Sequence, residues 1–92
     1  MTDRVDLIRT RLESALAPAS IEVIDDSHRH AGHAGARDGR GHFRVTVVSQ
    51  RFAGLRAIER HQLVHAALSD LMKTDIHALS ISAQAPDEAV HR

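Results

Sequence analysis

Hydrophobic residues near the start of the chain recur every three or four positions, the spacing of one face of an α-helix. They are Val5, Ile8, Leu12, Ala15 and Leu16. Thr2 and Asp3 precede them as candidate N-caps, and Pro18 follows them. The pattern predicts an amphipathic helix that ends before the proline.

Three later segments alternate hydrophobic and polar residues, which is the period of a β-strand with one buried face. They are residues 21–25, 42–49 and 76–83. In the third segment, alternation puts His77 on the same inward face as Leu79 and Ile81. A histidine there can be a buried or edge residue or a ligand, and the pattern leaves both interpretations open.

A second helical pattern lies between the last two strands, and the polar end of the chain follows them. The residues on the inward side of this helix are Ile58, Val64, Ala67, Leu68, Leu71 and Met72. The last segment, QAPDEAVHR, is short and contains a proline, so we expect a loosely held tail over residues 86–92.

The order helix, strand, strand, helix, strand predicts an α+β architecture. The first two strands can pair antiparallel, and a right-handed crossover through the second helix lays the third strand parallel to a neighbour. We therefore expect a three-stranded mixed sheet with both helices on one face. The predicted core includes Leu12, Phe43, Val45, Leu68 and Ile81.

The longest interruption, residues 26–41, is rich in glycine and histidine. It is too polar for a buried element and too long for a tight hairpin, so we expect a mobile loop with a function. His28, His30 and His33 lie within it. Their spacing fits either metal ligands or solvated residues, because a structural zinc site usually has four ligands and this loop offers three.

Composition narrows the class of protein. A chain of 92 residues predicts a single domain, 1–92, with a core of about residues 3–85. Twelve basic residues balance twelve acidic ones, so nucleic-acid binding would need a local patch. The chain has no cysteine, which excludes disulfides and thiolate ligands of its own. With no leader pattern and no long apolar run, we expect a cytoplasmic protein without membrane contact.

Two weaker patterns also contain residue types that can carry chemistry. His61 and His65 stand four apart on the second helix, a spacing that can chelate a metal, but the glutamate of an HExxH motif is missing and a surface or packing role is favoured. Asp25 and Asp26 adjoin Ser27 without any nucleophile motif, so we expect no enzymatic activity.

Several short motifs stand in one order along residues 21–88. They are HFRV at 42–45, SQRFAG at 49–54, RH at 60–61 and HAL at 77–79. In these motifs and their spacing the chain resembles the BolA family. The resemblance implies a fold similar to class II KH domains, which agrees with the predicted element order, so the chain would be a single BolA-like domain.

The resemblance also implies a partner and a cofactor. Members of the family form heterodimers with monothiol glutaredoxins and can bridge a [2Fe-2S] cluster, whose other iron is held by the glutaredoxin cysteine and a glutathione thiol. The family's C-terminal ligand matches His77, and its loop ligand matches His30, with His28 and His33 as alternatives. The isolated chain would then hold no cofactor tightly. The implied role is in cluster trafficking or iron regulation.

An alternative is a DNA-binding transcriptional regulator, as some BolA relatives are described. Arg51, Arg56 and Arg60 flank the start of the second helix and could meet phosphates. The zero net charge and the lack of the GxxG clamp of KH domains weigh against this alternative.

Overall fold

A computed structural model of the protein describes residues 3–27 and 41–89. Their elements, in chain order, are α1 Arg4–Leu16, β1 Ser20–Asp25, β2 Gly41–Val48, the 3-10 turn η2 Gln50–Phe52, α3 Ala57–Ala67, α4 Ser69–Thr74, β3 Ile76–Gln84 and α5 Pro86–Ala89. Each predicted strand is present within one residue of its expected bounds.

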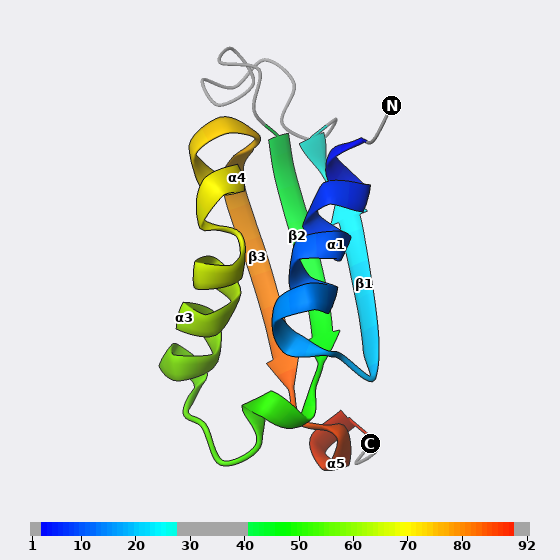
Figure 1. Ribbon diagram of the computed structural model, residues 1–92, viewed down its shortest axis with the longest axis vertical. Coiled ribbons are helices and arrows are strands. Elements are labelled where there is room, and N and C mark those ends of the chain that lie inside the picture. Colours follow the sequence, from blue (N-terminus) through cyan, green and yellow to red (C-terminus); the bar gives the residue numbers. More distant parts are fainter. Residues whose placement is uncertain (1–2, 28–40, 90–92) are drawn as a thin grey trace.

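The three strands form one sheet in the order β1-β2-β3. β1 pairs antiparallel with β2, and β2 pairs parallel with β3. Figure 1 shows α1 lying over β1 and β2, with α3 and α4 beside it over β3. Since both helical layers cover the same face, the predicted α+β architecture with a mixed sheet is confirmed.

α1 begins and ends as its sequence predicts. The Asp3 carboxylate accepts a hydrogen bond from the Asp6 N–H at 2.9 Å, which satisfies one donor of the first turn. The helix ends at Ala17, whose backbone is left-handed with φ 43° and whose N–H donates to the Glu13 carbonyl at 3.1 Å. Pro18 then leads the chain toward β1.

The core lies between the sheet and the helices. Four of the five predicted core residues are buried, namely Leu12, Phe43, Val45 and Leu68, whereas Ile81 is half-buried on the edge strand β3. The turn after β2 also contributes to the core. Phe52 is fully buried, and the buried Ser49 hydroxyl donates to the Leu16 carbonyl at 2.6 Å, linking this turn to the end of α1.

The predicted second helix is divided. α3 and α4 meet at Leu68, which leaves helical geometry with φ −108° and ψ 13° and is fully buried. The prediction that Ile58 faces inward was wrong, because its side chain is 55% exposed. At about 100° per residue, Ile58 stands roughly 120° around α3 from Val64, the buried residue that marks the inward face.

The prediction of a loose tail was wrong for the residues that the structure describes up to Ala89. α5 is held by Glu88, whose carboxylate accepts from the Arg60 guanidinium at 2.6 and 2.9 Å and from the Ala85 N–H at 2.8 Å. These hydrogen bonds, from Arg60 foremost, lower the pKa of Glu88 to about 2. These hydrogen bonds are not predictable from the sequence pattern, because their partners lie on different elements.

No helix among the described residues is long and apolar enough to cross a membrane.

Candidate functional site

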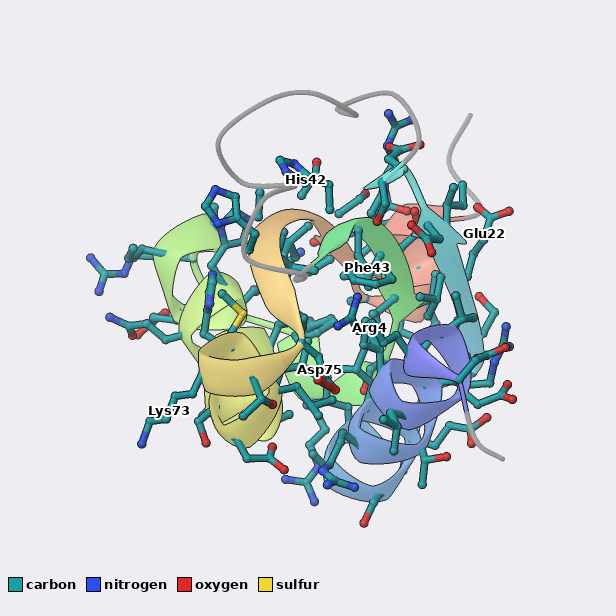
Figure 2. All side chains as sticks on the ribbon, turned by 90° about the horizontal axis from the view of Figure 1, so that it is seen from above. Arg4, Glu22, His42, Phe43, Lys73 and Asp75 are labelled. Carbon is teal, nitrogen blue, oxygen red and sulfur yellow. The ribbon has the colours of Figure 1, made fainter. Side chains whose placement is uncertain are left out.

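Two histidines meet at one end of the sheet. His42 lies at the start of β2 and His77 at the start of β3, and their ring centroids are 5.2 Å apart with the planes tilted by 46°. Parallel strands begin at the same edge of a sheet, so residues 35 positions apart come together. Figure 2 shows His42 on the side of the sheet away from α1 and α4.

An irregularity in strand pairing directs His77 outward. Gly41 is opposite Ile76, whereas His42 is opposite Ala78, so β3 has one residue more than β2 at this point. Such a β-bulge re-aims a side chain. Ile76 is fully buried and His77 is exposed. The prediction that His77 shares the inward face with Leu79 and Ile81 was therefore wrong.

The described residues that flank segment 28–40 lie next to this histidine pair. The Ser27 hydroxyl accepts from the His42 N–H at 3.1 Å, and the Asp26 N–H donates to the His42 carbonyl at 2.8 Å. A Cβ at Gly41 would lie 2.6 Å from the Ser27 hydroxyl and 2.7 Å from the Phe43 ring, so the close approach requires glycine.

The loop histidines predicted as ligands, His28, His30 and His33, lie outside the described residues. The residues that flank their segment, Ser27 and Gly41, lie next to His42, Ser27 by a hydrogen bond and Gly41 as its neighbour in the chain.

A pocket of about 260 Å³ adjoins the pair on the open face of the sheet. Its lining residues are Asp26, His42, Phe43, Arg44, Ala78, Leu79 and Ser80. The Arg44 guanidinium is 3.1 Å from the Asp26 carboxylate, so the cationic and anionic groups of the lining largely offset each other. The pocket provides room beside His42 for water or a small ligand.

The other candidate histidines do not join this site. His61 and His65 are both exposed on α3. Within residues 3–27 and 41–89, no group of three or more histidine, aspartate or glutamate side chains is placed to hold a metal ion. Among the described residues, the His42–His77 pair therefore has no third histidine or carboxylate placed to complete a metal site.

The arginines predicted to meet phosphates are placed differently from one another. Arg51 and Arg56 are exposed beside the start of α3, where Arg56 lies 3.5 Å from Glu59. Arg60 is engaged within the protein by Glu88 and by the carbonyls of Leu55 and Ala83 at 3.0 and 3.1 Å, and only 13% of its side chain is exposed. Little of the Arg60 side chain is therefore left on the surface for a phosphate.

His42 was not singled out from the sequence as a candidate ligand, although a signal for it existed. It precedes the buried Phe43 on a strand, so alternation puts it on the opposite face of the sheet. It also follows the histidine-containing segment directly. The proximity of His42 to His77 was not predictable, because it depends on the pairing and the bulge.

The fold and the site define a small α+β domain with a histidine pair at the start of two parallel strands. A family model described as BolA-like protein matches residues 12–88. The chain belongs to the BolA family, as its motifs predict.

Individual relatives support this membership. The chain is 49% identical to BolA-like protein 1 of Bos taurus over 79 residues, covering 86% of this chain and 56% of that protein. It is 41% identical to the DNA-binding transcriptional regulator BolA of Vibrio cholerae, covering 90% of this chain and 76% of that protein. The chain thus spans little more than half the length of the bovine relative.

Among solved structures, the BolA domain of SufE1 from Arabidopsis thaliana superposes with a TM-score of 0.83 at 40% identity. The match covers 96% of this chain and 98% of that domain.

Proposed function

We propose that this protein is an adaptor that pairs with a monothiol glutaredoxin and shares a bridging [2Fe-2S] cluster with it, in cluster trafficking or iron regulation in the cytoplasm. His77 is one ligand and His30 the second, with His28 and His33 as alternatives. The role is binding, without catalytic turnover.

The observation that carries the proposal is the exposure of His77 at the bulge, on a chain that belongs to the BolA family. A ligand to a group shared between two proteins must be accessible and must leave coordination positions for the partner. His77 meets both requirements, since the described residues form no closed site around it.

The donor set of the chain also fits such a cluster. The chain has no thiol, so its ligands to iron would be neutral imidazoles, while the partner and glutathione provide the thiolates. Nitrogen ligation of this kind raises the reduction potential of a [2Fe-2S] cluster relative to all-thiolate ligation. The chain's own part is to hold His77 outward on a paired strand and to bring the ends of segment 28–40 beside it.

The test is anaerobic reconstitution of the chain with a monothiol glutaredoxin, glutathione, iron and sulfide. Visible circular dichroism reports the cluster, and pulsed EPR of the reduced state reports nitrogen ligands. We expect His77→Ala to abolish the nitrogen couplings, and one loop variant among His30→Ala, His28→Ala and His33→Ala to do the same.

His61→Ala serves as the matched control, because it removes an exposed histidine from α3. It should leave both spectra unchanged. If the wild-type pair forms no cluster, the proposal fails. If nitrogen couplings survive His77→Ala, the ligand assignment fails even though the partnership stands.

DNA binding is a second candidate function, favoured by the similarity to the Vibrio cholerae regulator. Arg51 and Arg56 are exposed and could meet phosphates near the start of α3. This function predicts a duplex affinity that falls with salt, and a salt slope that decreases by about one for each of Arg51→Ala and Arg56→Ala. An affinity that neither salt nor these variants change would exclude it.

A further inference from the structure

The His42–His77 pair has a property that the shared cluster does not use. The proposed function takes His77 and a loop histidine as ligands and gives His42 no role. We propose that His42 and His77 together bind one divalent metal ion of the zinc type in the chain without its partner. This inference shares only His77 with the proposed function.

The distance between the two rings fits ligation of one ion. A zinc–nitrogen bond of about 2.1 Å places each ring centroid about 3.2 Å from the metal, so two imidazoles at a tetrahedral angle have centroids roughly 5 Å apart. The observed centroid distance is 5.2 Å. The ring planes are tilted by 46°, so the two rings do not stack face to face. In a face-to-face stack, the nitrogens of the two rings would point in parallel directions.

Hydrogen bonds of the backbone fix the positions of the two histidines relative to each other before any ion binds. His42 is tied to the end of β1 by the Asp26 N–H and the Ser27 hydroxyl, at 2.8 and 3.1 Å. Next to it, the Gly41 N–H donates at 2.9 Å to the carbonyl of Asp75, which precedes β3. Both strands are thereby fixed beside each other at the point where the rings meet. A preorganised pair loses less conformational freedom on binding.

The surroundings tolerate a cation and supply the remaining ligands. Arg44, which lines the adjoining pocket, is paired with Asp26 at 3.1 Å, so its charge is offset. The pocket of about 260 Å³, which His42 helps to line, has room for water. With two imidazoles and two waters, the ion would be exchangeable, and by ligand type the site suits zinc, copper or nickel more than magnesium or calcium.

Ion binding has a consequence for the proposed adaptor role. An imidazole of His77 that ligates a zinc ion cannot ligate iron in a cluster at the same time. Zinc and the partner-bound cluster therefore compete for this chain, and a zinc-loaded chain would be withheld from cluster assembly.

The experiment uses the full chain alone, titrated with Zn²⁺ and followed by calorimetry and by imidazole ¹H–¹⁵N NMR. Co²⁺ provides a second probe, because its visible absorption reports tetrahedral ligation. We expect the resonances of His42 and His77 to shift together, and His42→Ala and His77→Ala each to weaken zinc binding at least tenfold.

The double variant His61→Ala/His65→Ala is the matched control. It removes a pair of exposed histidines four apart on α3, which is a competing arrangement for the same ion. It should leave the affinity of the His42–His77 site unchanged. His42→Phe keeps a ring in place and replaces His42→Ala if that variant unfolds.

The inference is overturned if zinc affinity survives loss of the His42 imidazole, or if zinc shifts His77 together with another histidine and not His42. Neither result bears on the cluster proposal, because that proposal is tested in the complex with the glutaredoxin. Conversely, the absence of a cluster in that complex would leave zinc binding by the isolated chain intact.

Discussion

At the scale of single residues, two positions have a conformation or direction that their residue type does not predict. Ala17 ends α1 in a left-handed conformation with φ 43°, a region where a Cβ is strained and glycine is the usual residue. His77 is turned away from the core by a single additional residue in β3. Local alternation could predict neither, since one depends on the turn toward β1 and the other on strand register.

Replacing Ala17 by glycine should stabilise the protein. The substitution removes the strain of a Cβ in the left-handed region, worth roughly 1–2 kcal/mol, and part of this gain is lost to the greater freedom of glycine in the unfolded chain. We expect a net rise in the free energy of unfolding of about 0.5–1 kcal/mol by urea denaturation. Ala19→Gly, outside α1 and exposed, is the control, and equal effects from both variants would contradict the explanation.

At the scale of elements, the periodicity of the sequence predicted where helices and strands lie better than how they end. The three strands and α1 follow directly from their hydrophobic patterns. The break at Leu68 and the formation of α5 do not, because both depend on tertiary contacts. α5 spans only four residues and is held in place by the hydrogen bond between its Glu88 and Arg60 of α3.

Glu88→Gln should destabilise α5 and the protein in a pH-dependent way. Since folding lowers the pKa of Glu88 from 4.5 to about 2, its carboxylate contributes stability that is full above pH 4.5 and is lost as pH falls toward 2. The difference between wild type and Glu88→Gln in urea midpoint should therefore be largest near pH 7 and shrink below pH 4.5.

The neighbouring acid Asp87 provides the control for that measurement. Asp87→Asn changes charge on the same helix without removing the hydrogen bonds to Arg60 and Ala85. If the pH profile for Asp87→Asn is as steep as that for Glu88→Gln, the pH dependence of stability comes from the net charge of α5. It then does not come from the hydrogen bonds of Glu88.

At the scale of the whole molecule, α1, α3 and α4 cover one face of the sheet (Figure 1). The start of α1 reaches the β3 side through Arg4, whose guanidinium lies 3.9 Å from Asp75, and the two are close in Figure 2. Arg11 and Asp70 link α1 to α4 at 2.8 Å, which lowers the pKa of Asp70. Such exposed pairs contribute little individually, so the packed layer between sheet and helices dominates stability.

Truncation of the core should therefore outweigh truncation of the helix surface. Leu68→Ala removes a fully buried side chain at the junction of α3 and α4, and we expect a loss of roughly 2–5 kcal/mol in the free energy of unfolding. Ile58→Ala removes a side chain that is 55% exposed and should change it by less than about 0.5 kcal/mol. Comparable losses would mean that α3 does not pack as the structure has it.

The bulge at His77 separates two roles of the start of β3, which are packing in the core and presenting a side chain to the outside. Ile76 and Leu79 pack against the core, whereas His77 faces outward. His77 can therefore be exchanged without disturbing that packing. A cysteine or an aspartate at position 77 should thus fold as well as histidine does. The chemistry presented at this edge can consequently change over evolution, or by design, at almost no cost to the scaffold that presents it.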